Sequence, residues 1–224
     1  MNDDNLPVSV VIPVLNAAAA LPETLHTLVG AAEIVVVDAG SQDGTADIAR
    51  AHHARVLTAP RGRGGQIAAG VAIARHEWLL ILHADTRLAA GWRQAALRHM
   101  ECGPNCAGYF KFALNSDDPR ARRLERMVAW RCRRFALPYG DQGLLIHRDL
   151  LVKVGGMRPL PLMEDVDLVR RLGRARLSML DATATTSAVK WEREGWTLRS
   201  TRNLLCLSLW FAGVPPRAIA RFYT

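Results

Sequence analysis

The apolar positions of the first hundred residues fall into short runs separated by longer amphipathic stretches. The runs lie at residues 8–14, 33–38, 55–58 and 78–82. The first of them is rich in β-branched residues, and a continuous apolar run is typical of a strand buried on both faces. Helical patterns follow the first three runs, at residues 22–29, from about Thr45, and at residues 66–75. This alternation predicts an α/β fold with a parallel sheet covered by helices.

The second half of the chain has a different pattern. Residues 107–114 predict a further strand, and residues 119–135 predict a helix that carries seven arginines. At 100° per residue one face of this helix is apolar and the opposite face is charged; the apolar positions are Leu124, Met127, Val128 and Phe135, and the charged ones are Arg122, Arg126 and Arg133. The division favours a solvated arginine face, with an anionic membrane or a phosphorylated acceptor as the alternative.

Residues 198–223 are strongly helical in pattern and include an apolar stretch at 204–214. That stretch is about half the length that a bilayer-spanning helix needs. Pro215 and Pro216 interrupt the pattern, so a short final helix is expected after them. We expect this segment to pack on the rest of the chain, or to lie at a membrane surface through nearby arginines.

Composition narrows the class of protein. The 224 residues are 50% hydrophobic and 22% charged, which suits one globular domain with a sizeable core. The net charge of +8 comes almost wholly from arginine, a residue suited to bidentate phosphate contacts, so phosphorylated small molecules, nucleic acid and anionic lipid are all candidate partners. The four cysteines form no CxxC pair and the first residues lack a signal-peptide pattern, which favours a cytoplasmic setting.

Polar residues with ligand chemistry follow the predicted strands. They are Asp38, the Asp43–Gly44 turn, the "RGRGG" stretch at 61–65, and His83–Ala84–Asp85. Ligands of parallel α/β sheets bind beyond the carboxyl ends of the strands, so these residues are expected at one edge. His83 and Asp85 end an apolar run with two potential metal ligands.

The stretch "RGRGGQIAAG" predicts a phosphate-binding loop of no standard type. It lacks the GK[ST] ending of a P-loop, and Ile67 stands where the dinucleotide fingerprint has its third glycine. We expect residues 59–65 to form a loop in which glycines, Arg61 and Arg63 contact phosphate.

Two further carboxylate groups lie in the second half. Asp141 and Gln142 occupy a turn flanked by glycines, and Glu164 and Asp165 stand at a predicted helix start. Carboxylates at that position complement the helix dipole. They also suit a general base that takes a proton from a hydroxyl nucleophile.

The order of these motifs resembles that of the family 2 glycosyltransferases. The stretches "VVIPVLN", "IVVVDAGSQDGT", "APRGRGGQIAAG", "LLILHADTRL", "YGDQGLLIHR", "PLMEDVDLVRRL" and "KWEREGW" carry the resemblance across nearly the whole chain. They are most similar to the radical-SAM/selenodomain-associated subgroup. The resemblance implies the GT-A fold, a Rossmann-type mixed sheet flanked by helices. It divides the chain into a glycosyltransferase domain at 1–196, with nucleotide-binding and acceptor halves meeting near residue 100, and a helical segment at 197–224.

The resemblance also implies roles for particular residues. Asp85 matches the metal ligand of the family's DxD motif, and His83 replaces its first aspartate, so the implied cofactor is Mn²⁺ or Mg²⁺. Asp165 matches the catalytic base, with Glu164 and Asp141 assigned to the catalytic group. The implied binding residues for the nucleotide sugar are Pro13, Asn16, Asp38, Gly40, Asp43, Arg61, Arg63, Gln66, Ala84, Asp85, Gln142, Lys190 and Trp191. Ala17 and Ala68 depart from residues that are frequent in the family.

The resulting expectation is a metal-dependent, inverting glycosyltransferase of the hexosyltransferase type. It would move a sugar from a nucleotide diphosphate to a hydroxyl acceptor, either a small molecule or a lipid-linked one. It would be cytoplasmic, with peripheral contact at the inner face of a membrane through its C-terminal helices, and would not bind nucleic acid. A nucleotidyltransferase of related fold and a catalytically weak nucleotide-binding module are the alternatives.

Overall fold

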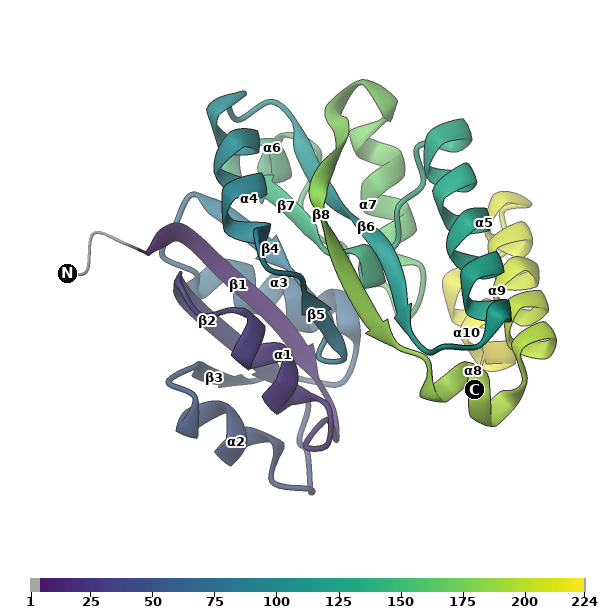
Figure 1. Cartoon of the computed structure of the whole chain (residues 1–224), viewed down its shortest axis with the longest axis horizontal. Helices are drawn as coiled ribbons and strands as arrows, with labels where there is room; N and C mark the ends of the chain where they lie inside the picture. The colour runs from purple at the N-terminus through teal and green to yellow at the C-terminus, as the bar shows by residue number, and fades with distance from the viewer. Residues whose placement is uncertain (1–4, 224) are drawn as a thin grey trace.

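The computed structural model describes residues 5–223, which form one mixed sheet with helices on both faces (Figure 1). Its strand order is β3-β2-β1-β4-β7-β6-β8-β5. The strands are β1 (Leu6–Val14), β2 (Ala31–Asp38), β3 (Arg55–Thr58), β4 (Trp78–Ile81), β5 (Thr86–Leu88), β6 (Ala107–Asn115), β7 (Leu144–His147) and β8 (Leu177–Ser187). The helices are α1 (Leu21–Thr27), α2 (Thr45–Ala51), α3 (Arg63–Ile73), α4 (Trp92–Glu101), α5 (Pro119–Phe135), α6 (Arg148–Lys153), α7 (Glu164–Leu172), α8 (Val189–Glu194), α9 (Trp196–Phe211) and α10 (Pro216–Tyr223).

The first half forms the parallel part of the sheet that the apolar runs predict. β1 pairs in parallel with β2 on one side and with β4 on the other, and β3 extends β2. Successive side chains of β1 enter different cores, because Val10 and Ile12 pack with α1 and α4 while Val11 packs with α3. Burial on both faces is why the run is apolar throughout. The carboxyl ends of these strands therefore lie at one edge.

The second half adds strands with both antiparallel and parallel neighbours. β7 runs antiparallel to β4 and to β6, and β8 pairs with β6 in parallel and with the short β5 antiparallel. Neither β5 nor β8 is among the strands predicted from the sequence. β5 has three residues, and β8 reads "LSMLDATATTS", whose buried positions alternate with exposed polar ones only from Leu180 onward. A sheet face half open to solvent produces this weaker signal.

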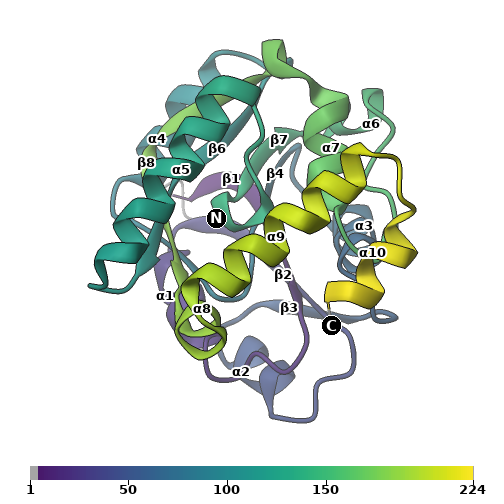
Figure 2. The same cartoon turned by 90° about the vertical axis from the view of Figure 1, so that its right-hand side faces the viewer.

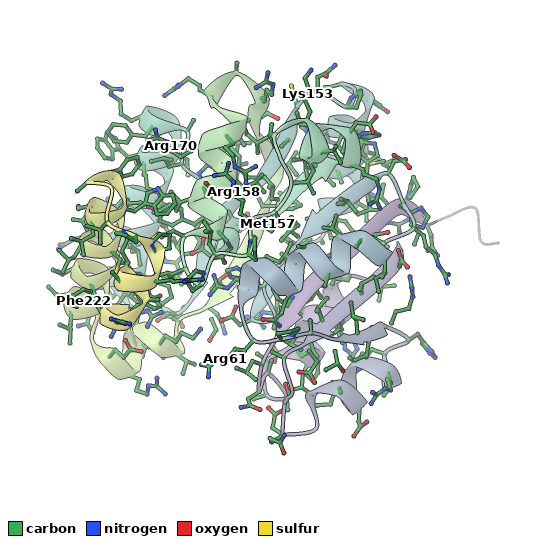
Figure 3. The ribbon with its side chains drawn as sticks, turned by 180° about the vertical axis from the view of Figure 1, so that it is seen from behind. Arg61, Lys153, Met157, Arg158, Arg170 and Phe222 are labelled. Atoms are coloured by element: carbon green, nitrogen blue, oxygen red, sulfur yellow. The ribbon has the colours of Figure 1, made fainter. Side chains whose placement is uncertain are left out.

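The predicted loop at 59–65 is wrong in its last three residues, because α3 begins at Arg63 and not at Gln66. Gly64 lies in the first helical turn, against the backbone of residues 158–160. A Cβ on Gly64 would lie 2.3 Å from the carbonyl oxygen of Arg158. Figure 3 labels Met157 and Arg158 on this segment beside α3. The glycine thus permits close contact between two backbones, which is a packing role.

The C-terminal segment consists of α9 and α10, separated by residues 212–215, and Pro216 begins α10, so a short helix follows the proline pair as predicted. Figure 2 shows α5 and α9 on the same side of the molecule, with α10 turning back from the end of α9. The apolar face of α5 is buried only in part. Val128 and Cys132 are buried, whereas Met127 and Phe135 are exposed. Within residues 5–223, no helix combines the length and the apolar character that crossing a membrane requires.

Candidate functional site

A cavity of about 150 Å³ lies at the carboxyl edge of the sheet, where the two halves of the chain meet. Its walls come from several elements: the turn between β4 and β5, the start of α3, the start of α7, the end of β8 and the first turn of α8. Of the residues proposed from the sequence, the cavity is lined by Arg63, His83, Asp85, Asp141, Asp165, Lys190 and Trp191. Side chains separated by more than a hundred residues thus share one cavity.

A chain of buried hydrogen bonds holds three of these elements together. The Thr86 hydroxyl of β5 lies 2.7 Å from that of Thr186 in β8, and the Thr186 hydroxyl donates to the carbonyl of Asp141 at 3.3 Å. The backbone N–H of Ser187 donates to the carbonyl of Asp85 at 3.1 Å. The position of the His83–Asp85 turn is therefore fixed by β8.

Glu164 and Asp165 point in different directions from the first turn of α7. The Asp165 carboxylate accepts hydrogen bonds from the backbone N–H of Gly140 at 2.8 Å and of Val166 at 2.7 Å, and it lines the cavity. Glu164 is buried and lies 3.2 Å from the guanidinium of Arg63. Glu164 therefore positions Arg63, while Asp165 is available to a ligand.

His83 packs against Gly140 at the back of the cavity. A Cβ on Gly140 would lie 2.5 Å from His83 Nε2 and 3.3 Å from Asp165 Oδ2, so the ring and the carboxylate converge on this glycine. Burial, together with the positive charges of Arg63 and Lys190, lowers the pKa of His83 well below its usual value. The ring is therefore neutral at physiological pH, which is the form that binds metals.

The acidic groups of the site lie close enough to affect each other's ionisation. Burial raises the pKa of Asp141 to about 6; Arg131 opposes the shift, and the charges of Asp165 and Asp85 add to it. Burial also raises the pKa of Glu164 to about 7, with Asp165 adding to the shift and Arg63 opposing it. Buried carboxylates that repel one another are stabilised by a cation.

The residues of the cavity fit a divalent cation. Asp141 Oδ1 is buried and has no hydrogen-bond partner among residues 5–223. Among the described residues, the one ion pair of Asp85 is with Lys190, at 3.8 Å, and His83 adds a neutral imidazole. Carboxylate oxygens with one imidazole suit Mn²⁺, and the carboxylates alone suit Mg²⁺.

A second cluster with metal-ligand chemistry lies at the opposite end of β4. The ligand atoms of Glu77, His147 and Asp149 are within 4.8 Å of one another. Glu77 and Asp149 are exposed, and the cluster does not border the cavity. It is therefore separate from the site at the carboxyl edge.

The residues expected at the nucleotide form a network beside the cavity, at the ends of β1 and β2. The Asp38 carboxylate accepts from the backbone N–H and the hydroxyl of Ser41. Asn16 accepts from the N–H of Gln42, and Asp43 accepts from the N–H groups of Ala18 and Thr45. Gly40 has φ +87°, which allows the sharp turn after β2. These side chains shape a rigid loop pair.

Four other residues of the proposed set support the framework of the site by hydrogen bonds or by burial. The Gln66 amide donates to the carbonyls of Val14 and Val37, so it ties α3 to both strand ends. The Gln142 amide donates to Phe110 O and supports the Gly140–Gln142 turn. Pro13 is buried in β1, and the Ala84 carbonyl accepts from Thr24. Arg61, in contrast, is exposed beside the start of α3 (Figure 3).

Several residues that line the cavity were not among the site residues proposed from the sequence. Asn203 of α9 and Tyr223 of α10 reach it because the C-terminal helices fold back onto the domain. Arg199 bridges Glu194 and the Tyr223 hydroxyl, at 2.9 and 3.3 Å. Tyr139 begins the "YGDQGLLIHR" stretch, so its place in that motif was the one available clue.

Two comparisons of solved structures address the fold. S. aureus TarS (residues 1–349) aligns with a TM-score of 0.62 at 15% identity, covering 90% of this chain and 65% of that one. Glucosyl-3-phosphoglycerate synthase from Mycobacterium tuberculosis, solved with Mn²⁺, UDP and glucosyl-3-phosphoglycerate, aligns with a TM-score of 0.54 at 20% identity, covering 80% of this chain and 70% of that one. At these identities the likeness concerns the fold, and it confirms the predicted GT-A architecture.

Sequence comparison gives the family. Uncharacterized glycosyltransferases of Mycobacterium bovis and Mycobacterium tuberculosis are 38% identical to this chain over 85 residues. The match spans 38% of this chain and 39% of each relative. A family model described as Glycosyl transferase family 2 matches residues 9–161, which is more than half of the chain. The chain belongs to glycosyl transferase family 2.

Proposed function

We propose that this protein is a metal-dependent, inverting glycosyltransferase of the hexosyltransferase type that uses a nucleotide-diphosphate sugar. One observation carries the proposal: Asp85, His83 and Asp165, which come from distant motifs, line the same cavity at the carboxyl edge of the sheet. Such a transfer requires metal ligands on the side of the leaving diphosphate and a carboxylate that reaches the attacking hydroxyl.

Asp165 is proposed as the general base. Its carboxylate is oriented by the backbone N–H of Gly140 and still borders the cavity. From there it can take the proton of an acceptor hydroxyl as the oxygen attacks the anomeric carbon opposite the leaving group. A single displacement of this kind inverts the configuration at that carbon.

Asp85 and His83 are proposed to hold the divalent cation, with Asp141 beside them. When bound, the cation would offset the negative charge that grows on the departing diphosphate. Arg63 and Lys190 border the same cavity and supply positive charge from the protein itself. Arg63 is held in place by its ion pair with Glu164, so its charge is oriented before the reaction begins.

The finer assignments made from the sequence are proposals as well. We place the chain in the radical-SAM/selenodomain-associated subgroup on its motif order. We place the transferase domain at residues 1–196 and the helical segment at 197–224. The nucleotide base and ribose are assigned to the loop pair that carries Asn16, Asp38 and Asp43. We propose a cytoplasmic enzyme whose C-terminal helices contact the inner face of a membrane.

Calorimetric titration tests the donor site. A panel of nucleoside diphosphates and their sugars is titrated with and without Mn²⁺ or Mg²⁺ into the wild type and Asp85→Asn. We expect binding that needs the metal and that weakens at least about tenfold in the variant, because a charged ligand is lost. Asp149→Asn is the matched control, since Asp149 belongs to the separate cluster near His147.

Two results would contradict the proposal. One is the absence of nucleotide binding across the panel, and the other is an equal loss of binding in Asp149→Asn. Product analysis then separates the enzyme classes. A glycosyltransferase releases a nucleoside diphosphate, whereas a nucleotidyltransferase consumes or releases pyrophosphate.

A further inference from the structure

A second, larger cavity of about 620 Å³ runs between α5 and α9 and adjoins the candidate site. Both views of the ribbon place these helices side by side (Figures 1 and 2). Its walls are mainly apolar and include Met127, Val128, Trp130, Phe135, Leu204 and Phe211. We call this cavity the α5–α9 groove. Its volume falls within the range of about 300 to 1,000 Å³ that is usual for small-molecule sites.

The groove exposes large apolar side chains to solvent. Met127 is 58% exposed, Trp130 57% and Leu204 62%. Apolar residues at helical spacing on α5 ordinarily pack against the core of a domain, but here part of that face borders an open cavity. A contiguous exposed apolar surface of this kind marks a binding site for an apolar group.

The groove opens into the cavity that holds the candidate catalytic residues. Tyr139, Asp141, Trp191, Asn203 and Leu207 line both of them. A ligand can therefore occupy the groove with one end and reach Asp165 with the other. This continuity assigns the groove to the acceptor, because Arg63, His83 and Asp85 line the first cavity but not the groove.

The wall shared by the two cavities carries polar atoms that lack partners. Asn203 Oδ1 and Trp191 Nε1 are buried, and neither has a hydrogen-bond partner among the residues that the structure describes. A buried polar atom without a partner costs free energy, so these atoms favour a ligand that supplies partners. One acceptor and one donor complement a hydroxyl group, which both donates and accepts.

We propose that the acceptor is an amphiphile. Its hydroxyl-bearing head lies at the shared wall within reach of Asp165, and its apolar chain lies in the α5–α9 groove. This inference rests on the proposed function, because it names the substrate class of the same site. A single amphiphile would cover the exposed apolar residues of the groove and pair the unpartnered polar atoms of the shared wall.

A homologous series of alkyl glucosides tests the proposal. Methyl, butyl, hexyl and octyl glucoside share one hydroxyl-bearing head and differ only in the chain, and each is titrated by calorimetry below its micelle concentration. We expect the affinity to rise about fourfold for each added methylene that the groove takes up. An affinity that does not change with chain length would overturn the proposal.

Variants on α9 locate the chain. Leu204→Ser should weaken octyl glucoside roughly tenfold and leave methyl glucoside unchanged, because Leu204 lines the groove. Leu198→Ser is the matched control: Leu198 is on the same helix and is 68% exposed, but it does not line the groove. Equal loss in the two variants would overturn the assignment. So would a groove occupied by a second copy of the chain, seen in sedimentation as a dimer that Leu204→Ser dissociates.

A third variant locates the head. Asn203→Ala should weaken octyl glucoside about fivefold but leave 1-octanol unchanged, because the alcohol lacks the sugar hydroxyls that Asn203 would contact. Equal effects on both ligands would show that the head lies elsewhere, which contradicts the proposal. The donor titration fails or succeeds independently of this series. Nucleotide binding with a flat glucoside series rejects only the amphiphile, and the reverse pattern rejects only the donor site.

Discussion

Two regions at the carboxyl edge of the sheet differ in how their polar groups are paired. The loops at the ends of β1 and β2 pair theirs within the protein, whereas the wall shared by the two cavities keeps buried polar atoms without a partner among residues 5–223. Asp38, Asn16 and Asp43 bond to neighbouring backbone N–H groups, so this side of the edge is complete without a ligand. Among residues 5–223, Asn203 and Trp191 retain buried polar atoms without partners. The difference supports the proposal of a preorganised donor side and an acceptor side that a ligand completes.

Asp165→Asn gives the largest expected effect and tests whether chemistry depends on the boundary between the two sides. We expect transfer to fall roughly 100-fold to 10,000-fold, because the amide cannot take the acceptor proton. Release of nucleoside diphosphate in a coupled assay measures the rate. Binding of the nucleotide itself should change little. A variant that kept most of its activity would exclude Asp165 as the base.

Gly64→Ala breaks the packing on the donor side. The new Cβ would lie 2.3 Å from the Arg158 carbonyl, and overpacking of this kind costs about 1 to 3 kcal/mol of unfolding free energy. Urea denaturation measures the loss. Gly65→Ala is the control, because the nearest atom to its Cβ is Pro159 Cβ at 3.9 Å. Equal stability of the two variants would show that the helix start adjusts freely.

Glu33→Gln tests the satisfied network in the parallel half of the sheet. Burial raises the pKa of Glu33, but hydrogen bonds from Ser9, the Arg75 N–H and Arg55 outweigh it and place the pKa below its ordinary value. The charged form therefore stabilises the fold above the unfolded-state pKa, and this contribution is lost as the pH falls through the folded-state value. At neutral pH the substitution should cost roughly 1 to 3 kcal/mol.

Urea midpoints across a pH series measure this effect. The wild type should lose stability below about pH 4.3 more steeply than Glu33→Gln. Parallel profiles for the two proteins would contradict the assignment of the charge to this network.

Thr186→Val has the smallest expected effect on stability. It tests the hydrogen bonds by which Thr186 links β5, β8 and the turn that carries Asp141. It removes the 2.7 Å bond to Thr86 and the bond to the Asp141 carbonyl at nearly constant volume. We expect a loss of about 1 kcal/mol in unfolding free energy. Thr185→Val, one residue away and only half buried, should change stability less. The reverse ranking in chemical denaturation would show that the threonine pair is not a structural link.

The sequence predicts the parallel half of the fold well because β1, β2 and β4 are largely buried. β1 to β4 all occur within two residues of the apolar runs. β8 escapes prediction since its polar threonines give a weak alternating pattern, and α3 begins early because Gly64 meets another backbone segment and does not form a loop. Long-range packing decides both cases.

The candidate site divides in the same way. His83, Asp85 and Asp165 are recognisable because each stands at a strand end or helix start within an ordered set of motifs. Asn203 and Tyr223 are not, since a helical pattern does not reveal where a helix folds back. The groove was hidden for a related reason: the apolar face of α5 predicts burial, but the sequence does not say which part of that face the protein itself covers.

The attachment of β5 has a mechanical consequence. This edge strand follows directly after the His83–Asp85 turn and pairs only with β8 within residues 5–223. β8 ends at Ser187, and only Ala188 separates it from α8, which leads through Gly195 into α9. The strand that anchors Asp85 is thus nearly continuous with a wall of the groove. A displacement of that wall would therefore reach the turn through α8 and β8, with no long loop between them.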